Sequence, residues 1–245
     1  MIDWLKRSHL EPEIELNEVM VPIILKRHRT AKRLTLRLAP DGSEIRITLP
    51  QWARSTEAVA FANSRQEWLA QQHAKVPRKI EVGDGATIQF RGSQLRIDWN
   101  EAHARKPALC ANTIAVGGPK PGLEGRIKRW LEKEALALFE RDVAHYTKVA
   151  ELDLVPVGLS RAQKRWGSCS DGGASGSKRI RLNWRLVQAP DSVRQSVAAH
   201  EVAHLVHFDH SPAFHALLGS IYEGDIKEAD RWLKTNGRGL YSSFG

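Results

Sequence analysis

The chain has 245 residues and a mass of 27.5 kDa, enough for one sizeable hydrophobic core or two small ones. Its formal net charge of +9 and sequence pI near 9.8 indicate a surface that attracts phosphate-bearing partners. It has no run of about 18 apolar residues and no apolar signal core, and Cys110 and Cys169 are too few for a disulfide framework. These features exclude an integral membrane protein and a disulfide-stabilised secreted domain, so we expect a cytoplasmic protein with reduced thiols.

Basic side chains gather in the first predicted strands. Residues 20–50 are predicted to form three strands, with a hairpin turn at Asp41-Gly42, and the alternation of residues 33–38 is typical of an antiparallel sheet. The basic or potentially basic residues there are Lys26, Arg27, His28, Arg29, Lys32, Arg33 and Arg37. Two interpretations stay open: a solvated sheet face, or a surface for weak nucleic-acid or nucleotide contact.

A helix and more strands follow, and then a stretch that is typical of a linker. Apolar spacing predicts a helix over about 56–74, and strands near 86–91, 94–99 and 109–116. Residues 117–122 are only Gly, Pro and Lys, which favours a linker. We therefore predict an N-terminal antiparallel β-rich region with one helix over residues 1–120, and a second domain over residues 121–245.

The second predicted domain begins with a long helix. Apolar residues recur at helical spacing from Leu123 to about Val149. Two β-type runs, 163–170 and 180–186, are joined by a Gly/Ser-rich loop at 171–177 and predict a hairpin. A last helix is expected over about 226–234. The whole chain is thus predicted to be α+β.

Residues 200–204 read His-Glu-Val-Ala-His, and they carry the strongest chemical signal in the chain. In a helix, His200 and His204 leave the same face with Cα atoms about 6 Å apart, close enough to bind one zinc ion. Glu201 points about 100° away from His200, where it flanks the metal and does not ligate it. This is the His-Glu-x-x-His pattern of zinc hydrolases, in which the glutamate takes a proton from the attacking water.

A third ligand is expected from the turn after this helix. Ser211 as N-cap and Pro212 at the first helical position predict a new helix, so His210 lies in a turn and can fold back. His207 lies about 10 Å along the axis from His200, so we expect it to pack or to hold a ligand by a hydrogen bond. His215 belongs to the next helix, and Glu223 is the main rival as third ligand.

These motifs together resemble a known family. The segments "RWGSCS", "IRLNWRL" and "HEVAHL" followed by "HSPAF" are similar to the YgjP-like metallopeptidases, metal-dependent hydrolases related to the SprT-like and WLM zinc peptidases. The similarity covers about residues 120–240 well and extends to the basic strand near residue 30. It implies a zincin-like fold, zinc on His200, His204 and His210, and Glu201 as the catalytic base. The metzincin pattern fits less well, because His207 replaces its glycine and no methionine follows the histidines.

Three functions remain open from the sequence. The first is a zinc peptidase that acts on peptides or proteins through metal-activated water. The second is a nucleotide pyrophosphatase acting on UTP, an activity also attributed to members of this family. The third is a nucleic-acid-associated protein stabilised by zinc. The absence of a Walker-type phosphate loop weighs against the second, and only three protein ligands weigh against purely structural zinc.

Overall fold

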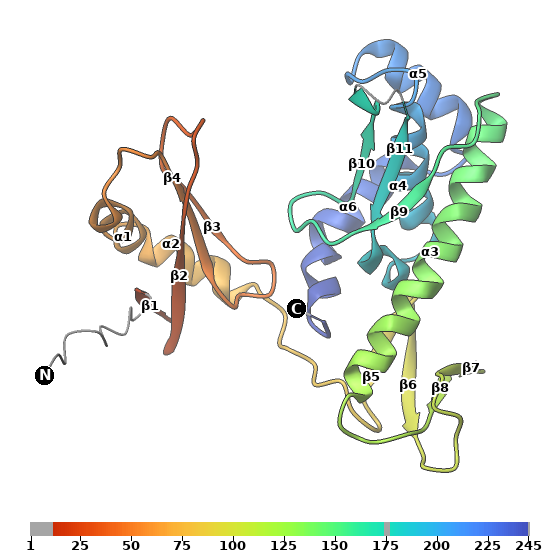
Figure 1. Ribbon diagram of the computed structural model, residues 1–245, viewed down its shortest axis with the longest axis horizontal. Helices are drawn as coiled ribbons and strands as arrows, with labels where there is room; N and C mark the ends of the chain where they lie inside the picture. Colours follow the sequence, from red (N-terminus) through yellow and green to blue (C-terminus); the bar gives the residue numbers. More distant parts are fainter. Residues whose placement is uncertain (1–11, 174–176, 245) are drawn as a thin grey trace, which may run out of the picture. The chain divides into compact units, whose positions relative to one another are not determined.

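A computed structural model describes residues 12–173 and 177–244, which form two compact units that meet in sequence after Arg78 (Figure 1). The sequence predicted a domain boundary at residue 120, whereas the two units divide after residue 78. Gly117 is buried, and the carbonyl of Gly118 accepts a 2.8 Å hydrogen bond from Trp99 Nε1. The Gly/Pro-rich stretch is therefore a packed turn within the second unit, not a linker. No helix in the described part of the chain is long and apolar enough to cross a membrane.

The first unit is a four-stranded sheet with two helices. Its elements are β1 (Glu13–Leu16), β2 (Val19–Arg27), β3 (Thr35–Leu38), β4 (Ile45–Leu49), α1 (Ser55–Asn63) and α2 (Gln66–Ala74). The strand order is β1-β2-β4-β3, and β2 runs parallel to β4, so the sheet is mixed and not purely antiparallel. The single helix predicted over 56–74 is two helices, interrupted at Ser64 and Arg65.

The sheet of the first unit separates an apolar face from a basic one. Ile45, Ile47 and Leu49 of β4 are buried, whereas Arg46 between them is exposed and lies opposite Arg37 of β3. All seven basic residues between positions 26 and 37 are exposed. One of them has a structural role, because Arg27 donates to the carbonyls of the loop that precedes α1.

The second unit contains two more sheets around a long helix. The first comprises β5 (Thr87–Phe90), β6 (Ser93–Trp99), β7 (Ala108–Cys110) and β8 (Thr113–Val116), in the order β5-β6-β8-β7 with β6 parallel to β8. The second comprises β9 (Val157–Ser160), β10 (Gly167–Ser170) and β11 (Arg179–Asn183), in the order β10-β11-β9. The helices are α3 (Leu123–Val149), α4 (Asp191–Ala203), α5 (Pro212–Ile221) and α6 (Ile226–Asn236), with 3₁₀ turns at Trp184–Gln188 and Gly237–Tyr241. The α+β class predicted from the sequence is confirmed, as are α3 and the β10–β11 hairpin.

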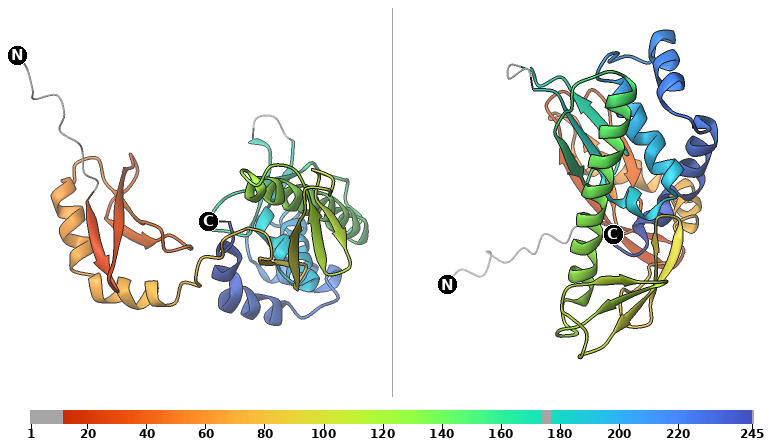
Figure 2. Two further views of the ribbon diagram at one scale, coloured as in Figure 1. Left: turned by 90° about the horizontal axis from the view of Figure 1, so that it is seen from below. Right: turned by 90° about the vertical axis from the view of Figure 1, so that its right-hand side faces the viewer.

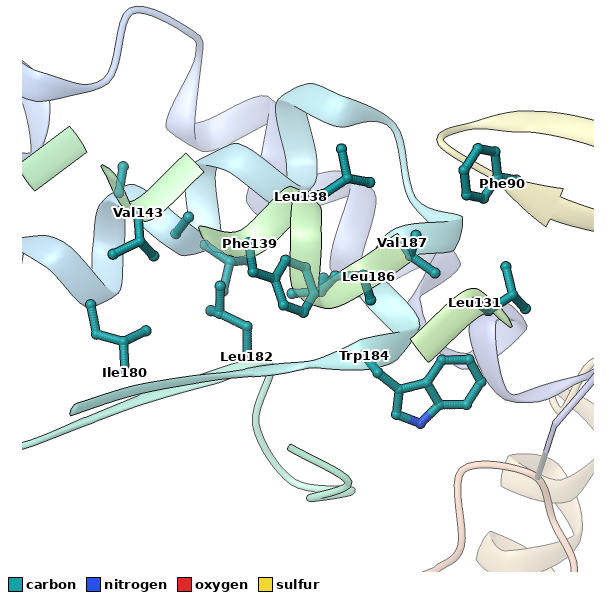
Figure 3. Close-up of a cluster of buried hydrophobic side chains, with 14 of the residues drawn as sticks. Phe90, Leu131, Leu138, Phe139, Val143, Ile180, Leu182, Trp184, Leu186 and Val187 are labelled. Carbon is teal, nitrogen blue, oxygen red and sulfur yellow. The ribbon is translucent and has the colours of Figure 1, made fainter. Parts of the chain in front are cut away.

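One hydrophobic core joins both sheets of the second unit to α3 and α4. Figure 3 shows Phe139 and Leu131 of α3 with Leu182 of β11 and Trp184 of the following turn, and each of these side chains is fully buried. Burial of each such side chain contributes roughly 1.5–3 kcal/mol. This core fixes α4 against α3 and the second sheet.

A buried ion-pair network also holds α4. The Arg194 side chain is 0% exposed, and its Nε donates to Asp142 Oδ2 of α3 at 2.6 Å. Its Nη1 donates to Asp191 at the start of α4, and Arg91 from the β5–β6 turn donates to the same carboxylate. Burial by itself would raise the pKa of Asp191, but the hydrogen bonds from the two arginines outweigh it and hold that pKa below its ordinary value.

The "IRLNWRL" motif holds the C-terminal segment. Asn183 donates to the Tyr241 hydroxyl at 3.4 Å and Gln188 to the Leu240 carbonyl at 3.0 Å, while Arg185 donates to the Phe244 carbonyl. The polar side chains of this motif, together with Gln188 just after it, therefore hold the C-terminal residues against the second unit.

Candidate metal centre

His200 and Glu201 lie in the last turn of α4, and His204 is its C-cap residue. The helix ends there because the next amide, Leu205 N–H, bonds the carbonyl of Val202 three residues back, at 2.9 Å. The sequence predicted that both histidines lie within the helix, but His204 is its C-cap residue, so the helix ends earlier than expected. His204 keeps helical angles, with φ −67° and ψ −15°, and its ring centroid lies 4.7 Å from that of His200.

His210 returns from the turn before α5 to complete the cluster. Ser211 caps α5 by accepting from Phe214 N–H, and Pro212 is its first residue, which confirms the predicted helix start. His210 Nε2 lies 3.3 Å from His200 Nε2. The fully buried Phe214 ring packs against all three imidazoles, with ring centroids 4.6–5.0 Å away.

The donor set of this cluster fits zinc. Ligand atoms of His200, His204 and His210 all lie within 4.8 Å of one another. The Nε2 atom of His200 is 3.1 Å from that of His204, and two nitrogen ligands of tetrahedral zinc stand about 3.3 Å apart for Zn–N bonds near 2.0–2.1 Å. His204 Nδ1 bonds the carbonyl oxygen of His207 at 2.8 Å, which leaves its Nε2 lone pair available.

Electrostatics keep the central imidazole neutral. Burial, followed by the neighbouring imidazoles, lowers the pKa of His200 to about 4. A neutral ring is the form that ligates a metal. The cluster is therefore ready to bind a cation at neutral pH without first releasing a proton from His200.

Glu201 is buried on the side of α4 that faces β10. It is 5% exposed, and burial raises the pKa of its carboxyl to about 7, against the opposing effects of Arg165 and of a hydrogen bond from the Cys169 backbone. A Cβ atom at Gly167 would lie only 2.6 Å from Glu201 Cγ. The glycine of "RWGSCS" thus makes room for this carboxylate, and the strand that contains it helps to orient the group.

The other candidate residues lie apart from the three histidines. His207 contributes its backbone carbonyl, and His215 is exposed on α5 with its ring centroid 6.4 Å from that of His210. Glu223 is 71% exposed and pairs with His145 of α3 at 3.6 Å. Among the described residues, the cluster that could hold a metal consists of His200, His204 and His210.

Three contributors to the site were not found by sequence reasoning. The Cys169 amide donates a hydrogen bond to Glu201, and the lack of a side chain at Gly167 leaves space for the Glu201 carboxylate. These two residues lie 32 and 34 positions before Glu201 in the sequence. Lys178 Nζ donates to the Leu205 carbonyl at 2.7 Å and so ties the residue before β11 to the turn that follows α4. No local signal marks Lys178, because its partner is a backbone carbonyl 27 residues away.

Comparison with known proteins gives one match. A family model described as YgjP-like, metallopeptidase domain, matches residues 32–236, well over half of the chain. No curated protein and no solved structure matches it. The matched segment contains the histidine cluster, Glu201 and the β10–β11 hairpin.

Proposed function

Because the chain belongs to the YgjP-like family of metal-dependent hydrolases, which is named for a metallopeptidase domain, we propose that it is a zinc-dependent peptidase. The observation that carries the proposal is the convergence of three imidazoles, with His200 Nε2 3.1 Å from His204 Nε2 and 3.3 Å from His210 Nε2. The helix that carries His200 also carries the buried Glu201, next to it in sequence. Three protein ligands leave a position open for water and substrate, as in catalytic zinc sites and unlike closed structural sites.

Glu201 is the general base and proton carrier in this proposal. Zinc, when bound, supplies Lewis-acid polarisation of a water molecule and of the scissile carbonyl. Glu201 takes a proton from that water on a carboxylate oxygen and delivers it to the leaving amine nitrogen. The backbone N–H of Cys169 and the packing against Gly167 hold the carboxylate in place, so that little reorganisation is needed during proton transfer.

The edge strand β10 favours an extended peptide as substrate. Strand β10 is terminal in the order β10-β11-β9, and its residues Gly167 and Cys169 border Glu201. An edge strand offers unpaired backbone donors and acceptors to which a peptide can add as a further strand. A peptide aligned in this way would pass beside Glu201, where the scissile bond must lie.

The proposal is tested by Glu201→Gln, which keeps the size of the side chain and removes the base. We expect unchanged zinc content and a loss of about 10²–10⁴-fold in hydrolysis of an unfolded protein substrate such as casein. Glu223→Gln is the matched control, an exposed glutamate whose replacement should leave activity near that of the parent. UTP is assayed in parallel, and turnover of UTP without protein cleavage would replace the peptidase proposal by the pyrophosphatase one.

The ligand set is tested by measuring bound zinc. His210→Ala should weaken zinc binding by more than about 100-fold, since the loss of a ligand exceeds the 10–100-fold cost of losing a group that supports one. His215→Ala is the control from the same region, and it should retain zinc because its ring stands outside the cluster. Retention of zinc by His210→Ala, with loss in Glu223→Gln, would instead assign the third ligand to Glu223.

A further inference from the structure

A cationic cavity lies at the start of α3. It has a volume of about 390 Å³ and opens between the first turns of α3 and the loop that follows β6. Five of its lining side chains are cationic: Arg105, Lys106, Arg126, Arg129 and Lys133. We call it the α3 cavity. The elements that line it, the start of α3 and the loop after β6, lie beside the β5–β8 sheet at one end of the second unit, whereas α5 lies at the other end (Figures 1 and 2).

The cavity combines charges from two segments. Arg126, Arg129 and Lys133 are spaced three and four residues apart, so they share one face of α3. A Cβ atom at Gly125 would lie 3.3 Å from Arg129 Nη1, and one at Gly118 would lie 3.0 Å from Arg105 Cγ. Glycine at both positions thus leaves space for the arginines that line the cavity.

These charges have no carboxylate to neutralise them. No acidic residue lines the α3 cavity, and none of its five cations forms an ion pair within the described residues. Like charges in a concave surface reinforce one another's potential, because the surrounding protein screens them less than water does. Such a cavity attracts an anion.

Arg126 adds a buried donor without an acceptor. The residue is 7% exposed, and its Nη2 donates to the Pro119 carbonyl at 2.6 Å. Its Nε–H is buried and has no hydrogen-bond partner in the described structure. The carbonyls of Pro119 and Pro121 accept from this guanidinium and fix its charge at the wall of the α3 cavity.

The remaining wall is apolar. Trp130 and Pro107 line the same cavity, and Trp130 is held in place by the Phe90 ring at a centroid distance of 5.1 Å. A flat apolar body can therefore lie against this wall while an anionic group meets the cations. The volume falls within the 300–1,000 Å³ typical of small-molecule pockets.

We propose that the α3 cavity binds a small organic phosphate, with its phosphate on the cationic rim and its body against Trp130. A phosphate monoester presents three terminal oxygens, enough to accept from separate guanidinium and ammonium groups at once. The site is distinct from the histidine cluster, so it stands whether or not the proposed peptidase activity does.

Calorimetric titration of the zinc-loaded full chain tests this proposal. Phenyl phosphate is the main probe, and inorganic phosphate and an unphosphorylated single-stranded oligonucleotide are titrated at the same ionic strength. Arg129→Ala removes one rim charge, and Arg141→Ala is the matched control, because both are exposed arginines on α3 and only Arg129 lines the cavity. Binding of phosphate at the metal would be the same in both variants.

We expect phenyl phosphate to bind about tenfold more weakly to Arg129→Ala than to the parent, because a charge-assisted hydrogen bond is lost, and as tightly to Arg141→Ala as to the parent. Phenyl phosphate should also bind more tightly than inorganic phosphate. Equal weakening by both variants, or no difference between the two phosphates, would overturn the proposal. Tighter binding of the oligonucleotide would assign the cavity to a polymer instead of a small molecule.

Discussion

A group of basic residues in the first unit is exposed, whereas a group of charged residues around α4 in the second unit is buried and paired. In the first unit, the seven basic residues between Lys26 and Arg37 are all exposed on or beside a sheet face. In the second, Arg194 is 0% exposed and shares its guanidinium between two carboxylates. Exposed charges attract partners but are screened and mobile, whereas buried charges fix the geometry of the elements that carry them.

This contrast indicates where chemistry is expected. Catalysis needs groups held within a fraction of an ångström, and the second unit supplies this through a packed core and paired charges around α4. The same helix carries the Arg194 network near its start and Glu201 near its end. The basic side chains of the first unit are exposed and are not fixed in this way, so they are better suited to attracting a charged partner than to catalysis.

The largest expected effect is the difference in stability between a variant that breaks a buried ion pair and one that breaks an exposed ion pair. Asp142→Asn leaves Arg194 with a buried charge only partly compensated, and we expect a loss of about 3 kcal/mol in the free energy of unfolding. Glu44→Gln in the first unit breaks the exposed contact with Arg46 and should cost less than about 1 kcal/mol. Urea unfolding measures both, and comparable losses would remove the contrast between the units.

A second prediction concerns the fixation of Glu201. Gly167→Ala places a methyl group against this carboxylate, so we expect hydrolysis to fall about 100-fold while zinc is retained. Gly158→Ala in β9 is the control, because its nearest neighbour, Arg181 Cγ, lies at an ordinary 3.7 Å. Parent-like activity in Gly167→Ala would show that the position of Glu201 is not critical.

A third prediction concerns the basic face of the first unit, which we propose as a weak, sequence-independent contact for nucleic acid. Replacing Lys32, Arg33 and Arg37 by alanine should reduce the affinity for labelled duplex DNA about tenfold at low salt. The slope of log affinity against log salt should also flatten, since each neutralised phosphate contributes about −0.9. If the titration curves of the parent and the variant coincide, the basic face is only a solvated sheet face and does not bind nucleic acid.

The smallest effect concerns pH and the Asp191 carboxylate. Because its pKa is lowered in the folded protein, Asp191 contributes stability that is present above the unfolded value near 3.8 and is lost as pH falls through the folded value. Asp191→Asn should therefore be less stable than the parent at pH 7, by roughly 1 kcal/mol or less for a group this exposed. The difference should shrink as the pH falls below 3.8 and vanish once the pH lies below the folded pKa of Asp191. A difference that persists there would have to come from packing.

Local patterns in the sequence determined several features of this protein. The bounds of α3, the N-cap at Ser211 and the spacing of His200 and His204 each depend on residues within a few positions of one another. Helical periodicity, capping and the return of the chain at a turn act over such short distances. The sequence therefore predicted the α+β class and a cluster of three histidines that the structure does bring together.

Contacts between distant residues decided the rest. The Gly/Pro-rich stretch at residues 117–122 is part of the second unit, because the side chains of Trp99 and Arg126 donate hydrogen bonds to its carbonyls. No local sequence pattern distinguishes such a packed turn from a linker. Glycine at position 167 is explained only by Glu201, 34 residues later, and the α3 cavity forms only when the loop after β6 meets α3. Side-chain space, burial and the pairing of charges arise from packing, so they are properties of the tertiary structure alone.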